Sequence, residues 1–266
     1  MSRKRQTAHV CPRLPSPVTA LAYDIAHGHL IPEHLHPKDQ LVYASQNVMT
    51  VHTSAGTWVV PAQRAVWIPA RTPHSILMSG AVSMRTIYLR VRLVRQLPRD
   101  CCVVNVSPLL QRLILHLCTI GKLNRRSRTQ AHLIDVLIDQ LETVKAVPLQ
   151  LPSPADQRAA RVAAVLQGNL NGSRSLAWAC KQAGASKRTI ERLFQRETGI
   201  SLGKWREQLR LMRSLQLLAA GEKISHAALE AGYSTPSAFI AMFRKALGTT
   251  PRRYFENGSK DISGRV

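Results

Sequence analysis

The sequence predicts a multi-domain protein in which a small all-β barrel is followed by an all-α domain. Short runs of β-branched and aromatic residues, separated by Asn, Gly and Pro, fill residues 20–95. Apolar residues recur at helical spacing in the second part of the chain. There, AGASKRTIERLF at 183–194 has an echo 48 positions later, AGYSTPSAFIAMF at 231–243. Repetition at a fixed spacing indicates one supersecondary unit that is used twice.

The composition indicates an anionic partner and a reduced compartment. The 266 residues include 37 Lys and Arg against 15 Asp and Glu, which gives a formal net charge of +22. The five cysteines show no C-x-x-C pair, so free thiols are expected rather than a disulfide or zinc framework. The N-terminal MSRKRQTAHV lacks the apolar run of a signal peptide, and polar residues interrupt the uncharged stretch 40–63. We expect a cytoplasmic protein without a membrane partner.

Residues 15–97 are expected to form the β domain. Candidate strands include LVYAS, VMTVHT, TWVV and AVWI, and several short strands at close spacing are typical of an antiparallel barrel or sandwich. The clearest pattern is a period-two alternation near the end of this region, which predicts a half-buried strand. Its apolar positions are Ile87, Leu89, Val91 and Leu93, and they alternate with Tyr88, Arg90 and Arg92.

Residues 98–147 predict a helical connector that could dimerise the protein. Leu109–Leu117 and Leu133–Leu141 are apolar at helical spacing, and the basic turn GKLNRRSRT separates them. Residues 148–156 contain three prolines and predict a stiff linker. The all-α domain then covers 157–256.

Each copy of the repeat is typical of a helix-turn-helix. In the first unit, at about 175–197, Ser175 and Ser186 are placed to cap two helices, and Gly184 allows the positive φ of a tight turn. In the second unit, at about 224–247, Gly232 occupies the turn. A helix-turn-helix inserts its second helix into the major groove, so the sequence predicts double-stranded DNA as a partner.

The polar face of the second helix in the first unit carries candidate base-reading residues. Arg188 and Arg192 can each present a fork to guanine, and Glu191 can accept from a cytosine amino group. Alternatively, Lys187 and Glu191 form an ordinary i,i+4 ion pair on a solvated face, the favoured interpretation for an isolated helix. The repeat favours DNA reading. In the second unit the outward positions are small and offer mainly thymine-methyl or backbone contacts: Ser237, Ala238 and Ala241.

The helix expected between the units, KWREQLRLMRSLQLLAAG from residue 204, could hold two reading heads in successive major grooves, about 34 Å apart. Its basic residues are candidate phosphate contacts, although each could equally be solvated surface: Lys204, Arg206, Arg210 and Arg213.

The segments GYSTPSAFIAMFRKALGTTPRRYF (232–255) and SLAWACKQAGASKRTIERLFQRETGIS (175–201) resemble the paired motifs of the AraC/XylS class of bacterial transcription regulators. By position, the base-reading slots of this class fall on Arg188, Glu191 and Arg192, and on the three small residues of the second unit. The resemblance implies an activator or repressor that binds promoter DNA, a small-molecule effector and RNA polymerase.

The segment EHLHPKDQ (33–40) places His34 and His36 on one face if it is extended, and His74 follows after further strands. This pattern resembles the metal motif of the cupin barrel, which is often the effector domain in this regulator class. Gln40 stands where the cupin carboxylate would fall. Structural or effector-pocket histidines are therefore favoured over a bound divalent metal, no cofactor is required, and iron catalysis is least expected.

Two alternatives remain open at this point. A metal-dependent cupin enzyme with an appended basic domain would show metal content and turnover, but no Ser-His-Asp set or Gly-rich phosphate loop stands out, so no enzyme is expected. The charge alone also fits a nonspecific nucleic-acid coating protein. Three aromatic residues could line an apolar effector pocket, although barrel core is their more frequent use: Trp58, Trp67 and Tyr88.

Overall fold

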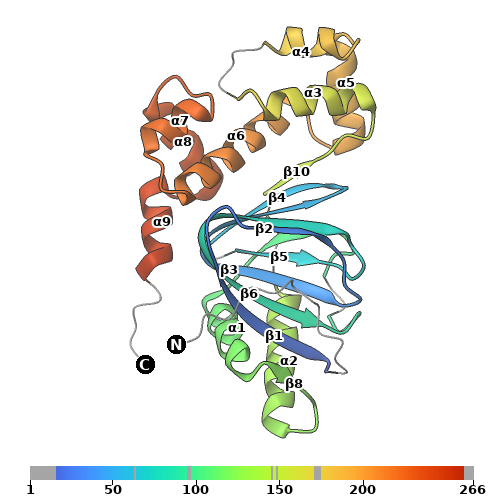
Figure 1. The fold of residues 1–266 in the computed structure, drawn as a ribbon, viewed down its shortest axis with the longest axis vertical. Coiled ribbons are helices and arrows are strands. Elements are labelled where there is room, and N and C mark those ends of the chain that lie inside the picture. Colours follow the sequence, from blue (N-terminus) through green and yellow to red (C-terminus); the bar gives the residue numbers. More distant parts are fainter. Residues whose placement is uncertain are drawn as a thin grey trace.

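The computed structural model describes residues 16–62, 64–94, 97–144, 146–147, 149–170 and 175–260. Figure 1 shows a β domain with two helices beneath it and a helical domain above and beside it. The predicted fold class, a β domain followed by an all-α domain, is confirmed. Pro15, Gln63, the segment MSRKRQTAHV and the last six residues lie outside the described residues.

Two long antiparallel strands, β3 and β6, organise the sheet and pair with each other along most of their length. Among the described residues the sheet has ten strands, and its main path runs β8-β1-β6-β3-β5-β7-β9. Strands β2, β4 and β10 lie off this path. The strands are β1 (Val18–Ile25), β2 (Leu30–His34), β3 (Asp39–Thr53), β4 (Gly56–Pro61), β5 (Arg64–Ile68), β6 (His74–Leu89), β7 (Cys102–Asn105), β8 (Lys122–Leu123), β9 (Ala146–Val147) and β10 (Gln150–Pro152).

Both long strands change partners halfway. β3 pairs with β5 before Asn47 and with β4 after it, while β6 pairs with β2 before Gly80 and with β1 after it. Asn47 and Gly80 have positive φ angles of 59° and 83°, and the register of β3 against β6 shifts beside Asn47. Such irregularities bend a sheet. Among the described strands the hydrogen-bonded path stays open, so the expected barrel is not a closed ring.

The prediction of a half-buried strand at 87–93 is wrong beyond Leu89. Strand β6 ends there, Val91 is 47% exposed, and Ile87 and Tyr88 are both buried although they face opposite sides. The physical reason is that β6 is central. Helix α1 (Pro108–Ile120) covers one face, so apolar and polar positions do not alternate with exposure.

The predicted helix pair is present as α1 and α2 (Arg128–Glu142), which begin after the capping residues Ser107 and Ser127. Both helices pack their apolar stripes on the β1–β6 side of the sheet. The expected connector also contains β7, β8 and β9, and the expected linker contains β10, which pairs with β4. These segments are therefore parts of the sheet, because short apolar stretches can complete its edges.

The helical domain contains both predicted helix-turn-helix units. Figure 1 shows α6 running between them, above β4 and β10. Within the described residues, no helix combines the length and apolar character that a membrane crossing requires. The helices are α3 (Gln157–Gln167), α4 (Leu176–Gln182), α5 (Lys187–Thr198), α6 (Leu202–Ala219), α7 (Ile224–Glu230), α8 (Pro236–Leu247) and α9 (Pro251–Lys260).

Candidate DNA interface and sensor-domain sites

Capping and turn residues in the local sequence determine where α5, the second helix of the first unit, begins and how it is oriented. The Ser175 hydroxyl accepts a hydrogen bond from the Trp178 amide at 3.1 Å, and the Ser186 hydroxyl accepts one from the Thr189 amide at 3.2 Å. Between the helices Gly184 has a φ of 65°, which a residue without a Cβ adopts at low cost. The predicted caps and turn are confirmed, and together they fix the angle at which α5 leaves α4.

Helix α5 buries one face and exposes the candidate base-reading face. The buried side chains are Ile190, Leu193 and Phe194, while Lys187, Arg188, Glu191 and Arg192 are exposed. Lys187 Nζ lies 3.7 Å from Glu191 Oε1, so the ion pair expected as the alternative is present. Exposed pairs of this kind contribute only a few tenths of a kcal/mol. In the described part of the chain, Arg188 and Arg192 have no ion-pair or hydrogen-bond partner, so their forks are available.

The second unit repeats this construction with different chemistry on its outer face. The Thr235 hydroxyl accepts from the Ala238 amide at 3.2 Å and caps α8, whose first residue is Pro236. Gly232 has a φ of 78°, and a Cβ on it would come within 2.4 Å of the Leu170 carbonyl oxygen. The predicted contact residues of this unit lie exposed on α8 but carry little polar functionality: Ser237, Ala238 and Ala241.

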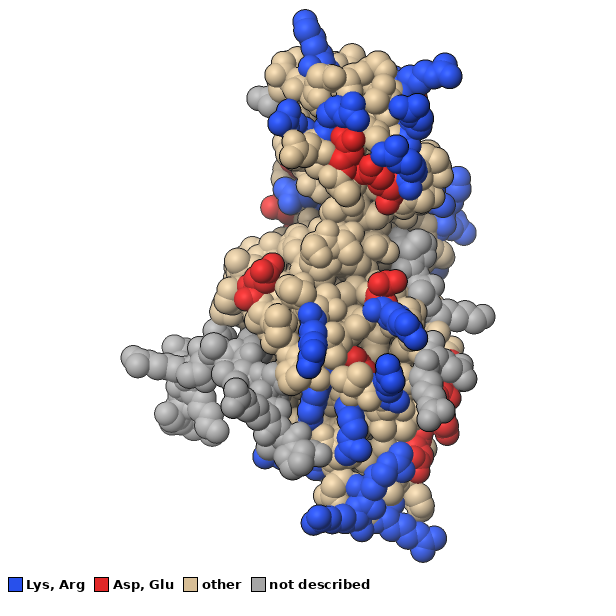
Figure 2. Space-filling view, turned by 90° about the vertical axis from the view of Figure 1, so that its right-hand side faces the viewer, with Lys and Arg blue, Asp and Glu red and all other residues tan. Residues whose placement is uncertain are grey.

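Three of the four basic residues that are candidate phosphate contacts on α6 line cavities at the boundary between the domains. Arg210 Cζ lies 5.4 Å from the centroid of the Tyr233 ring, and both Lys204 and Arg210 line a cavity against the β domain. Arg213 lines a second cavity at the same boundary. Elsewhere, Figure 2 shows Lys and Arg side chains gathered over the helical upper end of the molecule and over its lower tip. Lys204, Arg210 and Arg213 thus line cavities at the domain boundary, and no signal in the sequence indicated this.

The three histidines of the β domain come together as predicted. His34 at the end of β2 pairs with His74 at the start of β6. Their ring centroids lie 4.3 Å apart, and that of His36 lies 5.1 Å from His74 and 6.2 Å from His34. Each Nδ1 faces a backbone carbonyl oxygen, those of Pro32, Lys38 and Thr72, at 2.6 to 2.9 Å. A neutral ring therefore keeps its proton on Nδ1 and leaves Nε2 as an acceptor.

Gln40 binds His36 rather than standing as a free ligand. Its amide lies 2.7 Å from His36 Nε2 and 2.8 Å from the Thr86 hydroxyl. Burial lowers the pKa of His36, and it lowers the pKa of His74 to about 4, so both rings are neutral near pH 7. With Nδ1 of His36 donating to a carbonyl, Nε2 needs a donor. In the structure the Gln40 oxygen faces His36 Nε2 and its NH₂ donates to Thr86; the reversed amide, with NH₂ toward His36 and oxygen toward Thr86, is the orientation that pairs a donor with Nε2 of the neutral ring.

This histidine cluster does not fit a metal ion as it is arranged. Within the described residues, no group of three or more His, Cys, Asp or Glu side chains is placed to hold one. The nearby Asp39 carboxylate accepts from the backbone amides of Ala70 and Arg92. His74 Nε2 is buried and has no hydrogen-bond partner among the described residues.

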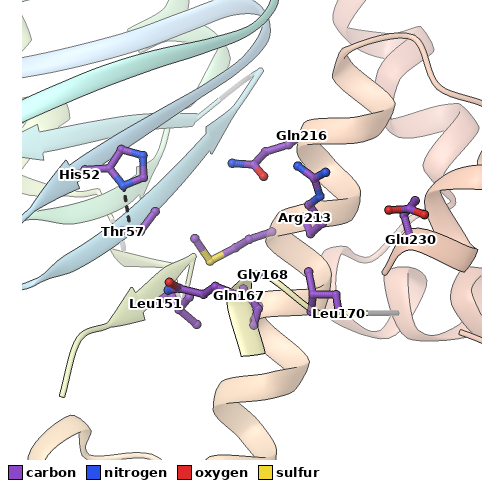
Figure 3. A pocket seen from close by; sticks show the side chains of 11 residues that line it. His52, Thr57, Leu151, Gln167, Gly168, Leu170, Arg213, Gln216 and Glu230 are labelled. Atoms are coloured by element: carbon purple, nitrogen blue, oxygen red, sulfur yellow. Dashed lines mark hydrogen bonds between the residues drawn. The ribbon is translucent and has the colours of Figure 1, made fainter. Parts of the chain in front are cut away.

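The aromatic residues considered for an effector pocket belong to the core instead. Trp58, Trp67 and Tyr88 are at most 3% exposed. Two cavities lie at the boundary between the domains, with volumes of about 460 and 610 Å³. Figure 3 shows the smaller one, in which His52 and Thr57 on the strand side face residues of α6 and α7. Sequence reasoning missed both cavities, because their walls combine segments far apart in the chain.

The chain matches two protein-family models in the same order as its two domains. Residues 16–157, over half of the chain, match the AraC-like ligand binding domain, and residues 179–257 match a helix-turn-helix domain. The HTH-type transcriptional regulator NimR of Escherichia coli (strain K12) is 34% identical over 224 residues, which cover 84% of this chain and 81% of that protein.

Two further proteins illustrate the range of similarity. The virulence regulon transcriptional activator VirF of Yersinia enterocolitica is 27% identical over 70% of each chain. The crystal structure of ToxT from Vibrio cholerae O395 aligns with a TM-score of 0.40 and 11% identity, over 92% of this chain and 99% of that one.

A ligand-binding β domain joined to a DNA-binding helix-turn-helix domain defines the class of ligand-responsive transcription regulators. Within that class the chain belongs to the AraC family. This assignment favours the regulator over the metal-dependent cupin enzyme, since the relatives are transcription regulators.

Proposed function

We propose that the protein reads double-stranded promoter DNA with α5 and α8 in successive major grooves, and that a small effector bound by the sensor domain alters this reading. One observation supports the proposal above all. The two units have the same construction, each with a capped second helix and an exposed outer face, and the single helix α6 joins them. Such a rigid spacer suits two reading heads on one face of the duplex.

The two helix-turn-helix units would contribute unequally to the recognition of the base sequence. Arg188 and Arg192 are suited to guanine O6 and N7, and Glu191 to a cytosine amino group, while Lys187 lies near enough to orient Glu191 or to reach a phosphate. Ser237, Ala238 and Ala241 would contact thymine methyl groups or approach the backbone closely. We therefore assign most of the direct readout to the first unit.

A footprint on the DNA upstream of the gene and of its divergent neighbour tests this reading, at about 150 mM salt with excess competitor DNA. Arg188→Ala or Arg192→Ala is expected to cost about 1 to 3 kcal/mol at the preferred site and to relax the preference at one base pair. Lys122→Ala, which removes the same charge far from both heads, serves as the control. Equal weakening on all sequences would assign the arginine to phosphate, and uniform protection would favour a coating protein.

The proposed regulator also has two protein partners, a second copy of the chain and RNA polymerase. The α1–α2 pair exposes Leu109 and Val136, which are 56% and 40% accessible, and this apolar surface supports a homodimer contact testable by sedimentation. We further propose an intracellular regulator, without enzymatic activity, that acts with RNA polymerase as activator or repressor. We also propose that the sensor domain extends beyond the expected 15–97 through the connector (98–147) and the linker (148–156), since β7, β8, β9 and β10 pair within its sheet, and that the DNA-binding domain covers 157–256.

A further inference from the structure

The end of the β domain that lies opposite α4 and α5 exposes arginines from two neighbouring loops (Figure 1). The chain leaves β6 after Leu89 and β8 after Leu123, and both residues pair with Val18 of β1. The two loops therefore leave the sheet at the same end, about 10 Å or two strand spacings apart. Figure 2 shows Lys and Arg side chains gathered over this tip. We call this surface the basic end, and its members are Arg90, Arg92, Arg125, Arg126 and Arg128.

Hydrogen bonds hold the backbone of both loops. In the loop after β6, the Arg92 amide donates to the Asp39 carboxylate at 3.4 Å. In the loop after β8, the Asn124 side-chain oxygen accepts from the amides of Arg126 and Ser127, at 2.9 and 3.4 Å. The arginine side chains thus project from a backbone that is already fixed, which lowers the entropy lost when they bind a partner.

The rest of the chain leaves most of this charge unpaired. Arg125 Nη2 lies 2.7 Å from the Asp135 carboxylate, whereas the other four side chains have no ion-pair or hydrogen-bond partner among the described residues. Arg128 is also the first residue of α2, whose first turn has no acidic residue and whose last turn has no basic one. This charge distribution opposes the helix dipole, so the arginine at the N-terminus does not stabilise α2. The charge of the basic end remains available to an anionic partner.

The chemistry of the basic end fits a DNA backbone better than an acidic protein or a membrane. All of its charges are guanidinium groups, whose planar forks match phosphate oxygens. Its one large exposed apolar side chain is Val91, whereas a protein interface needs an apolar core. A peripheral membrane surface likewise combines basic residues with several apolar anchors.

We propose that the basic end binds the sugar-phosphate backbone of a second DNA segment while α5 and α8 read the first. The sheet lies between α6 and the basic end, so a straight duplex that follows α6 does not reach these arginines (Figure 1). Backbone contacts carry no sequence information, so the second segment is bound without sequence preference and its affinity falls with salt. The bridging of two segments rests on the proposed function, whereas backbone binding by the basic end does not.

The test is a capture assay with the full chain. The chain is loaded on a bead-bound duplex that carries the footprinted site, and a fluorescent duplex without the site is then added at about 100 mM salt. Arg126→Gln/Arg128→Gln should reduce capture of the second duplex at least about fivefold and leave occupancy of the first unchanged. Because two phosphate contacts are lost, the dependence of log K on log salt should also become less steep by about 2.

Two further variants assign the effect to charge. Arg126→Lys/Arg128→Lys keeps both charges and should retain most of the capture. Asp135→Asn releases Arg125 and should strengthen capture, which damage to the fold would not do. Denaturant unfolding should find Arg126→Gln/Arg128→Gln at least as stable as the wild type, because it removes a charge that opposes the α2 dipole.

The proposal is overturned if the glutamine variant captures the second duplex as well as the wild type does, or if Asp135→Asn fails to strengthen capture. It is also overturned if poly-glutamate or phosphatidylglycerol vesicles displace the second duplex at equal charge concentration, which would assign the basic end to an acidic protein or a membrane.

Fluorescence anisotropy of the site-free duplex separates this proposal from the proposed function. In the Arg188→Ala/Arg192→Ala background, neutralising Arg126 and Arg128 should still weaken binding of that duplex. Base preference in the footprint without this weakening rejects the second DNA segment alone. The weakening without any base preference supports the basic end and rejects the proposed reading by α5.

Discussion

His74 shows that burial, rather than residue type, decides the chemistry of a side chain. Its ring is fully buried beside two other histidines, and the burial lowers its pKa to about 4. The sequence could predict that the three histidines meet, because strand pairing follows from the β pattern. It could not predict that Gln40 would hold His36, or that Asp39 would turn to backbone amides, since both depend on side-chain placement around the β3 start.

The depressed pKa of His74 makes stability depend on pH. Unfolded histidine titrates near 6.5 and the folded residue near 4, so between these values the unfolded state binds the proton and the folded state does not. Stability is therefore complete above about pH 7 and falls as pH drops toward 4, by up to roughly 3 kcal/mol. Urea unfolding at several pH values measures this. His74→Asn should flatten the profile, whereas the exposed His226→Asn should leave it; equal effects would contradict the assignment.

At the scale of elements, the two helix-turn-helix units differ in one cap. Ser175, Ser186 and Thr235 each supply an oxygen to a helix amide, whereas α7 begins after Lys223, which supplies none. The positive charge of Lys223 also lies at the positive end of the helix dipole. Helix α7, the first helix of the second unit, is thus less stabilised at its N-terminus than α4, the first helix of the first unit.

Lys223→Ser should therefore stabilise the protein by about 0.5 to 1 kcal/mol, and Ser186→Ala should destabilise it by about 1 kcal/mol. Denaturant unfolding gives the totals, and amide hydrogen exchange in α7 localises the gain. Lys223→Ala is the matched control, because it removes the charge without adding a hydroxyl. If the alanine and serine variants are equally stable, the gain comes from the charge and the cap argument fails.

Elements specified by neighbouring residues were predictable, and those specified by distant partners were not. Serine caps, glycine turns and apolar stripes place α4, α5, α7 and α8 within a few residues of expectation. Strand β10 appears inside a proline-rich segment because β4 offers it an edge. Strand β6 stops at Leu89 although the alternation continues, because its pairings with β1 and with β3 both end at that residue. The local sequence pattern carries no information about the distant strands with which β10 and β6 pair.

At the scale of the whole molecule, α6 joins the two helix-turn-helix units and also contacts the sheet of the sensor domain (Figure 1). Gln216 Nε2 donates to the Thr50 hydroxyl on β3 at 2.9 Å, and one hydrophobic cluster continues from the sheet into the helices. A structural change in the sensor domain at this contact would be transmitted to α6, which joins the two helix-turn-helix units. Ligand-dependent DNA reading therefore has a direct structural route.

Gly80 provides a test of this contact. A Cβ on Gly80 would come 2.5 Å from the Ala219 carbonyl oxygen of α6 and 2.8 Å from Asn47 Cγ. Gly28 has a similar φ of 75° but no atom within 4 Å, so Gly28→Ala carries only the backbone strain, about 1 to 2 kcal/mol. We expect Gly80→Ala to cost clearly more in denaturant unfolding.

A double-mutant cycle assigns that additional cost to the domain contact rather than to the sheet. Gln216→Ala should cost about 1 kcal/mol in the wild-type and Gly28→Ala backgrounds, where its hydrogen bond to Thr50 is intact. In the Gly80→Ala background it should cost almost nothing, because α6 has already separated from β3 and β6. If the two costs in unfolding free energy are additive, the added methyl group is accommodated within the sheet, beside Asn47, and the contact between the sensor domain and α6 is intact.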